Sequence, residues 1–137
     1  MNNKGIISIL VPVYNEEKNI TYFFNRIIPV IEKFYYKYTF NFVFTDNDSS
    51  DQTIEEIKKY IDKELNITVI KLSKNFGRSA SQYAGLENSK ADLHFMIDID
   101  CEDPPELLEN FISKIESGYD IVYGIRNRIK ESIFLFF

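Results

Sequence analysis

Short apolar runs rich in β-branched and aromatic residues alternate along the chain with segments whose apolar residues recur every three or four positions. The apolar runs, each typical of a strand, lie at 6–13, 40–45, 67–72, 92–97 and 120–123. The segments with helical spacing lie at 15–31, 54–61, 78–88 and 104–116. Pro29 predicts a kink or an early end in the first of these helices. The alternation predicts an α/β fold with a doubly wound, mostly parallel sheet and helices on both faces.

Composition narrows the classes of function that such a fold can serve. The chain has 137 residues without a repeat or a linker, which predicts a single domain. Its formal net charge of −5 at pH 7 argues against a nucleic-acid partner, because such proteins usually present a basic face to phosphates. The single cysteine, Cys101, excludes an internal disulfide and is typical of a reducing compartment such as the cytoplasm. Neither standard glycine-rich phosphate loop is present, so phosphate binding would have to use a metal.

Acidic side chains are dense directly after the run at 92–97. Asp98, Asp100 and Glu102 alternate there, and in an extended chain residues i and i+2 point to the same side. Three such carboxylates can hold a hard cation, Mg²⁺ or Mn²⁺, together with the phosphates of a substrate. The alternative is that the acids from Asp100 to Asp103 only cap the helix that begins at Pro104.

Polar residues also follow the first two predicted strands. In an open α/β sheet, ligands bind beyond the carboxyl ends of the strands. Tyr14 can offer a ring face to a base, and Asp46 can accept a hydrogen bond from a pyrimidine imide or a purine amide. The alternatives are an ordinary strand exit at Tyr14 and a capped strand-to-helix turn after Asp46. Acidic strand ends at Glu16, Asp46 and Asp98, all on one edge of the sheet, favour a binding site.

The end of the chain differs in character from the rest. A basic stretch, 126–130, is followed by the apolar residues 133–137. This tail is either a last element that packs on the core or the start of a membrane-surface helix. We therefore divide the chain into a main domain, 1–125, and a tail, 126–137.

Four groups of residues, taken in order, form a recognisable set. They are Val11-Pro12-Val13-Tyr14-Asn15-Glu16, Asp46 to Asp51, Asn75-Phe76-Gly77 with Ala84-Gly85, and Asp98-Ile99-Asp100 followed by Asp103-Pro104-Pro105-Glu106. Together they resemble the family-2 glycosyltransferases over nearly the whole chain. Within that family the likeness is to the polyprenyl-phosphate branch, the dolichol-phosphate mannosyltransferase and bactoprenol glucosyltransferase type.

The resemblance implies a GT-A fold, Rossmann-like in its nucleotide-sugar half, and makes residues 1–125 the N-terminal part of a nucleotide-sugar-binding catalytic domain. It also implies an inverting transfer of a hexose from a nucleotide diphosphate sugar to a lipid phosphate, at the cytoplasmic face of a membrane. The substrate-binding residues that it implies are Pro12, Tyr14, Glu16, Phe44, Asp46, Asn75, Gly77 and Arg126. Asp98 and Asp100 would be catalytic and would hold Mg²⁺ or Mn²⁺, with Glu102 as a third metal ligand. Arg126 would meet a phosphate, or else belong to a solvated basic turn.

The chain departs from the family pattern at three positions and in length. Asn47 stands where the family usually has aspartate, Asp48 where it often has glycine, and Glu102 where this branch typically has glutamine. Members of the branch also continue past the point where this sequence stops, so we expect a truncated member. Two alternatives stay open: a noncatalytic nucleotide-binding remnant, and a receiver-type signalling domain.

Overall fold

A parallel sheet with helices on both of its faces makes up the protein. The computed structural model describes residues 4–126 except 62 and 64. The strands are β1 (Gly5–Val13), β2 (Tyr38–Asp46), β3 (Asn66–Lys71) and β4 (Leu93–Met96). The helices are α1 (Ile20–Glu32), α2 (Thr53–Ile61), α3 (Arg78–Glu87) and α4 (Leu107–Glu116). The order of the strands is β3-β2-β1-β4 and every pair is parallel, which confirms the predicted fold class.

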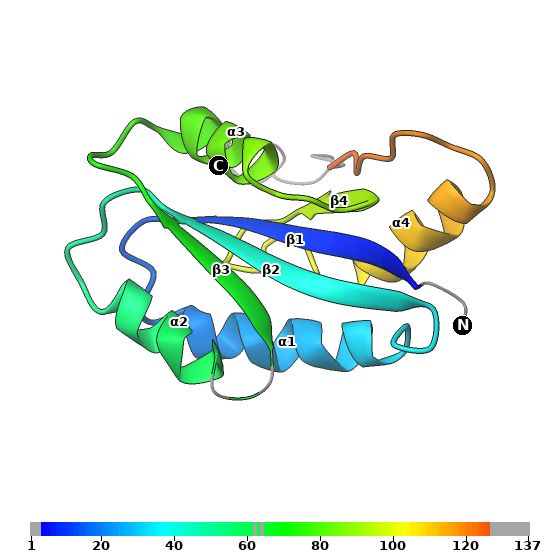
Figure 1. Ribbon diagram of the computed structural model, residues 1–137, viewed down its shortest axis with the longest axis horizontal. Helices are drawn as coiled ribbons and strands as arrows, with labels where there is room; N and C mark the ends of the chain where they lie inside the picture. The colour runs from blue at the N-terminus through cyan, green and yellow to red at the C-terminus, as the bar shows by residue number, and fades with distance from the viewer. Residues whose placement is uncertain (1–3, 62, 64, 127–137) are drawn as a thin grey trace, which may run out of the picture.

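The order of the strands decides where a ligand can enter. The chain builds outward from β1 through β2 to β3 and then returns to the other side of β1 to form β4. Helices α1 and α2 lie on one face of the sheet and α3 on the other (Figure 1). Strand order therefore reverses between β1 and β4, and the carboxyl ends of these two strands open a crevice.

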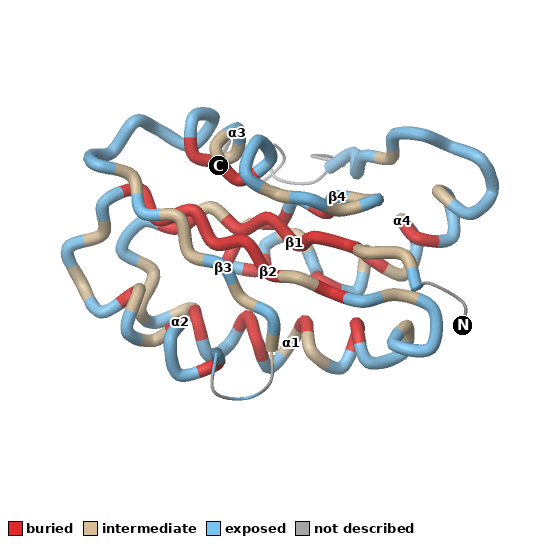
Figure 2. Tube along the Cα trace, viewed as in Figure 1, coloured by how far each residue is buried: buried red, intermediate tan, exposed pale blue. Residues whose placement is uncertain are grey.

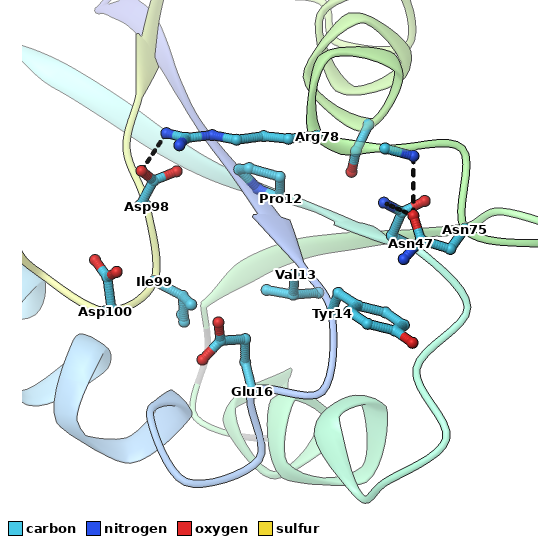
Figure 3. A pocket seen from close by; sticks show the side chains of 12 residues that line it. Pro12, Val13, Tyr14, Glu16, Asn47, Asn75, Arg78, Asp98, Ile99 and Asp100 are labelled. Atoms are coloured by element: carbon cyan, nitrogen blue, oxygen red, sulfur yellow. Dashed lines mark hydrogen bonds and ion pairs between the residues drawn. The ribbon is translucent and has the colours of Figure 1, made fainter.

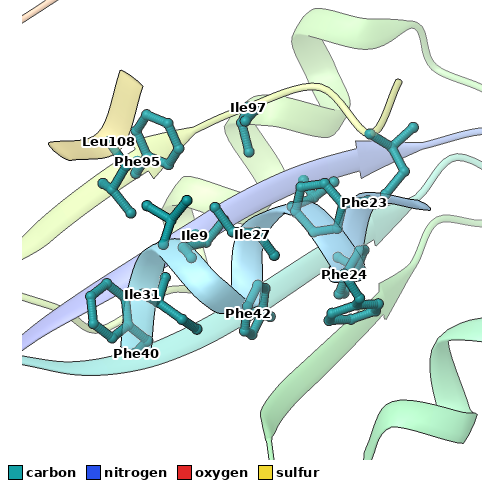
Figure 4. Close-up of a cluster of buried hydrophobic side chains, with 14 of the residues drawn as sticks. Ile9, Phe23, Phe24, Ile27, Ile31, Phe40, Phe42, Phe95, Ile97 and Leu108 are labelled. Carbon is teal, nitrogen blue, oxygen red and sulfur yellow. The ribbon is translucent and has the colours of Figure 1, made fainter. Parts of the chain in front are cut away.

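The hydrophobic core lies between the sheet and α1. Alternate residues of β1, among them Ile9, point to this side, and α1 covers them with side chains spaced three or four apart. The buried residues of α1 are Ile20, Phe23, Phe24, Ile27, Val30 and Ile31. Figure 2 shows the burial concentrated in the central strands, and Figure 4 shows α1 side chains meeting those of β1 and β2. The core thus fixes β1 and β2, whose ends carry polar residues.

Three local expectations differ from the structure. The first helix begins at Ile20, later than expected, and runs through the exposed Pro29 to Glu32, so it does not end at the proline. A fifth strand at 120–123 was predicted wrongly, since residues 120–126 form no strand. A cavity of about 510 Å³, lined by His94–Ile97 on one side and 122–126 on the other, separates this segment from β4. Its backbone therefore lacks a partner for a hydrogen-bond ladder.

The C-terminal tail predicted at 126–137 lies, except for residue 126, outside the described residues. Within the part of the chain that is described, no helix is both long and apolar enough to cross a bilayer. The proposed boundary after residue 125 therefore stays a prediction.

Close packing of α3 on β2 gives a first test of the fold. A Cβ added at Gly85 would lie 2.9 Å from Thr45 Oγ1, which is closer than packed side chains approach. Gly85→Ala is expected to lower the free energy of unfolding by about 1 kcal/mol, because overpacking outweighs the gain in helix propensity. In a Thr45→Ala background the same change is expected to be neutral or stabilising. Equal losses in both backgrounds, measured by urea unfolding, would show that the contact is not the cause.

Candidate active site

A cavity of about 420 Å³ opens at the crevice between β1 and β4. Its wall comes from the end of β1, the loop after β4 and the beginning of α3. The lining residues are Pro12, Val13, Tyr14, Glu16, Asn47, Asn75, Gly77, Arg78, Ser81, Asp98, Ile99 and Asp100. Figure 3 shows Arg78 extending across Pro12 toward Asp98. Residues far apart in the sequence therefore meet at the edge where the fold favours a ligand.

Seven of the residues proposed from the sequence meet in this cavity. They are Pro12, Tyr14, Glu16, Asn75, Gly77, Asp98 and Asp100. Four others do not line it: Phe44, Asp46, Glu102 and Arg126. The structure thus gathers the polar ends of β1 and β4 and leaves out part of the predicted set.

Side-chain alternation explains why Phe44 lies elsewhere. Phe44 is fully buried and its ring packs against Phe23 and Phe24 of α1, on the opposite face of the sheet from α3. The ring of Phe44 therefore belongs to the core and lies outside the cavity, and the proposed substrate contact stays a prediction. Asp46, two residues later, is also completely buried. One of its carboxylate oxygens accepts a hydrogen bond from the Ser49 N–H at 3.2 Å, and the other, Oδ1, has no partner among the described residues.

Cross-loop hydrogen bonds make one wall of the site from the segments after β1 and β2. The Asn15 N–H donates to Ser49 Oγ at 2.9 Å, and the Ser50 N–H donates back to Asn15 Oδ1 at 2.8 Å. The Glu16 N–H donates to Thr53 Oγ1 at 2.8 Å. These bonds hold Tyr14 and Glu16 at the rim, so the capping residues after Asp46 also position the β1 loop.

A second network fixes the turn that leads into α3. Asn47 is buried; its amide donates to Asn75 Oδ1 at 3.0 Å and accepts from the Phe76 N–H at 2.9 Å. The same Asn75 oxygen accepts the Gly77 N–H at 2.9 Å. Gly77 has φ +91°, a left-handed conformation that favours glycine. An aspartate at position 47 has no donor for Asn75, so the departure from the family pattern at Asn47 suits this turn.

Arg78, the first residue of α3, is the functional candidate that sequence reasoning missed. Its guanidinium donates to Asp98 Oδ2 and forms an ion pair with it across the mouth of the cavity. Its position directly after Asn75-Phe76-Gly77 was the available signal, because a residue that follows a glycine turn at a helix start faces the same edge as the turn.

Asp98 carries the main electrostatic perturbation of the site. Its partial burial raises the pKa of the carboxyl above its ordinary value, because burial disfavours the charged form. The positive charge of Arg78 opposes this effect, and the negative charges of Asp100 and Asp103 add to it. A cation placed between Asp98 and Asp100 would offset the cost of burying the charged Asp98 carboxylate and the repulsion between the two carboxylates.

The acids do not converge as an extended chain would bring them together. The chain turns at Ile99 and Asp100, and Cys101 has φ +58°, so alternation ends and Glu102 points elsewhere. Glu102 lies 3.5 Å from Arg126. Among the residues that the structure describes, no three His, Cys, Asp or Glu side chains are placed to hold a metal. Asp98 and Asp100 both line the cavity, and Mg²⁺ is commonly bound by one or two carboxylates plus phosphates, so a metal site at these two residues stays a prediction.

Arg126 neutralises acids on the far side of this loop. It donates to both carboxylate oxygens of Asp103, at 2.9 and 2.7 Å, and this hydrogen bonding holds the pKa of Asp103 below its ordinary value. Arg126 lines the neighbouring cavity beside β4 and not the one at the crevice. A direct phosphate contact from Arg126 would therefore need this pair to open.

The sequence of this chain is similar to the sequences of a known protein family. The sequence profile described as "Glycosyl transferase family 2" matches residues 8–137. The chain belongs to glycosyltransferase family 2. The receiver-type alternative is accordingly dropped.

Curated family-2 relatives match most of this chain with part of their own length. An uncharacterized glycosyltransferase of Synechocystis sp. is 33% identical over 120 residues, which are 88% of this chain and 37% of that protein. The undecaprenyl-phosphate 4-deoxy-4-formamido-L-arabinose transferase of Pseudomonas fluorescens is 30% identical over 129 residues, 93% of this chain and 38% of that protein. The chain thus spans less than two fifths of these relatives.

A solved structure has a similar fold. S. aureus TarS, residues 1–349 in complex with UDP, has a TM-score of 0.63 and 28% sequence identity to this chain. The match covers 81% of this chain and 32% of that one. It confirms the GT-A architecture inferred from the motifs.

The raised pKa of Asp98 leads to a prediction about stability. A carboxyl with a raised pKa binds its proton more tightly in the folded chain, so folding loses stability as pH rises from 3.8 through the raised value. Asp98→Asn removes this loss. We expect the variant to melt about 2 °C or more above the parent at pH 7 and level with it below pH 3.8. A variant that melts lower than the parent at pH 7 would contradict the burial effect.

Proposed function

We propose that this chain forms the donor-binding half of an inverting hexosyltransferase that takes a nucleotide diphosphate sugar and transfers the sugar to a polyprenyl phosphate. The observation that carries the proposal is that Asp98 and Asp100 meet the rim residues of β1 in one cavity, at the switch point of a family-2 fold. A relative of similar fold binds UDP, which supports a nucleoside diphosphate in this crevice.

The donor would lie across the carboxyl ends of β1 and β4. Pro12, Tyr14 and Glu16 form the wall for the nucleoside, with Tyr14 about half exposed and free to stack on a base. Asp46 Oδ1, buried without a partner among the described residues, is the acceptor that we propose for an imide or amide N–H of a base; because Asp46 does not line the cavity, this contact would need the loop after β2 to open. Asn75 and Gly77 close the opposite side.

Asp98 and Asp100 are the residues that would hold Mg²⁺ or Mn²⁺ with the donor diphosphate. The ion, when bound, supplies positive charge to the diphosphate as it departs from the sugar. The two carboxylates orient that charge at the β4 side of the cavity. Without a cation, the two charged carboxylates repel each other, and the burial of Asp98 adds to the cost of its negative charge.

A lipid phosphate suits the acceptor side of this chemistry. Its oxygen bonds to the anomeric carbon while the bond from that carbon to the diphosphate oxygen breaks, with inversion. A phosphate monoester is already ionised near neutral pH, so the reaction needs no strong general base. The titratable side chains among the described lining residues are Tyr14, Glu16, Arg78, Asp98 and Asp100. The undecaprenyl-phosphate transferase of Pseudomonas fluorescens supports this acceptor class.

A nucleotide-binding module without transfer activity is the second candidate. It is favoured by the share of the relatives that the chain covers, 37% and 38% of their lengths. Both candidate functions use the same nucleotide-binding cavity, and only the first includes transfer of the sugar. We propose the cytoplasmic face of a membrane as the place of action in the full-length enzyme; the tail that would contact lipid lies outside the described residues.

Nucleotide-dependent thermal stabilisation tests the site, and sugar transfer tests the reaction. UDP or GDP with Mn²⁺ is expected to raise the melting temperature of the chain, and the same nucleotide with EDTA is expected to raise it much less. No shift with either nucleotide in Mn²⁺ would overturn the proposal. Transfer from UDP- or GDP-hexose to undecaprenyl phosphate is then assayed on this chain and on a version extended to the length of its relatives. Product from the extended version alone would favour the second candidate for this chain.

A further inference from the structure

We propose that Arg78 exchanges between two anions, pairing with Asp98 in the ligand-free chain and with the donor diphosphate once a divalent cation has taken its place on Asp98. The inference rests on the proposed function and names a phosphate-binding residue for it. Arg78 would be both the counter-ion of Asp98 in the ligand-free pocket and a residue that binds the diphosphate.

The charges around the cavity make such a residue necessary. Among the described residues that line it, Arg78 is the only basic one, beside the carboxylates of Glu16, Asp98 and Asp100. A nucleoside diphosphate would add further negative charge to these three. A single divalent cation does not balance this charge, so a second positive group beside the diphosphate is needed to favour binding. Arginine suits this role because its planar guanidinium donates two parallel hydrogen bonds to a phosphate.

The ion pair is placed so that a cation can break it. The Arg78 side chain is 65% exposed and that of Asp98 is 21% exposed, so the arginine covers the carboxylate from the solvent side. Arg78 pairs with Asp98 Oδ2, so it competes with a metal for the carboxylate that would help to hold that metal. Exposed ion pairs contribute little net stability, and exchanging this one for a metal therefore costs little. A guanidinium displaced from Asp98 stays beside any phosphate that shares the metal.

The backbone of Arg78 is fixed, which limits where its side chain can go. The network from Asn47 through Asn75 to the Gly77 N–H ties the residue before Arg78 to the end of β2. Further along α3, Ser81 is buried and its hydroxyl donates to the Thr45 carbonyl at 3.1 Å. The first turn of α3 is thereby held against the sheet, and only the side chain of Arg78 moves between partners.

The test measures two affinities of Arg78→Ala that should change in opposite directions. Calorimetric titration with Mn²⁺ alone is expected to show binding about threefold tighter than in the parent, because the competing cation on Asp98 is gone. At saturating Mn²⁺, titration with UDP or GDP, whichever the parent binds more tightly, is expected to show a loss of about tenfold or more. Arg78→Lys, which keeps the charge and loses the paired donors, should fall between Arg78→Ala and the parent for the nucleotide.

A matched control separates this effect from the loss of any arginine. Arg26 pairs with Glu106 on the α1 side, at 2.8 Å and outside the cavity, so Arg26→Ala should leave both affinities unchanged within about twofold. Parent-like nucleotide affinity of folded Arg78→Ala, or weaker Mn²⁺ binding by it, would overturn the exchange while leaving the proposed function intact. Failure of the parent chain to bind either nucleotide would overturn the proposed function itself. Circular dichroism confirms that each variant is folded.

Discussion

Asp100→Asn is expected to weaken Mn²⁺-dependent binding of a nucleoside diphosphate by about a hundredfold or more. Replacement of groups that only support metal ligands typically costs about 10- to 100-fold in affinity, so loss of a ligand itself should lie at or beyond that range. The change is suited to the test because Asp100 is exposed and its Oδ1 accepts the Glu102 N–H at 3.0 Å, a bond that asparagine can also accept. The loop after β4 should therefore keep its shape.

The control for Asp100→Asn is Asp120→Asn, which removes one exposed carboxylate from the chain after α4. Asp120 lines a different cavity, beside β4 and α4, so binding in the crevice should be unchanged. Both variants change the net charge equally, and a difference between them therefore reports position. Near-parental affinity of Asp100→Asn, measured by calorimetry in Mn²⁺, would remove Asp100 from the metal site.

Phe24→Ala is expected to destabilise the chain by about 3–5 kcal/mol, a large part of the stability of an ordinary domain. Phe24 is fully buried, and its ring stacks on Tyr60 of α2 with centroids 3.9 Å apart. It also packs against Phe42 and Phe44, with ring centroids 5.4 and 5.7 Å away. Truncation leaves a cavity where α1, α2 and β2 meet, and the rim loops after β1 and β2 depend on that packing.

The control for Phe24→Ala is Tyr36→Ala, at an aromatic side chain that is 77% exposed. Its free energy of unfolding should stay within about 0.5 kcal/mol of the parent value. Guanidinium unfolding followed by circular dichroism measures both variants. A loss below about 1 kcal/mol for Phe24→Ala would show that the α1 face is not the main core.

Strands and helices of the core were readable from the sequence because burial imposes strict periods. The runs at 6–13 and 40–45 became β1 and β2 with shifts of one or two residues, and the spacing of Ile20, Phe23 and Phe24 gave α1 its packed face. The segment at 120–123 has the same composition as a strand but pairs with no strand among the described residues, and a cavity lies between part of it and β4. Composition predicts the capacity to pair, whereas pairing needs a second edge.

Individual positions in the site were harder to predict than the edge where it lies. Phe44 precedes a polar strand end in the sequence, yet alternation turns its ring toward α1. Glu102 continues the spacing of Asp98 and Asp100, yet the left-handed turn at Cys101 breaks the extended geometry on which that spacing depends. The pairing of Arg78 with Asp98 joins residues 20 positions apart, and only the sheet order brings them together.

Residues with strained backbone conformations lie at the edge of the sheet that carries the proposed site. The non-glycine residues with positive φ among those described are Asn15, Asp48 and Cys101, which follow β1, β2 and β4 respectively. Such conformations cost about 1–3 kcal/mol each and persist where the surroundings fix them. The loops that carry the proposed site are therefore held in place by the cross-loop hydrogen bonds and the core beneath them.

Paramagnetic broadening by Mn²⁺ tests the location of the donor site most directly. Amide signals of the ¹⁵N-labelled chain would be recorded with UDP or GDP and increasing Mn²⁺, with Mg²⁺ as the diamagnetic reference. The expected result is broadening centred on residues 98–100 that extends to 12–16 and 75–78, the segments that line the crevice. Residues 34–38, at the opposite end of the sheet where β2 begins, should keep their signals, and Asp100→Asn should abolish the effect. Broadening centred elsewhere, or none at all, would contradict a metal-dependent donor site at the ends of β1 and β4.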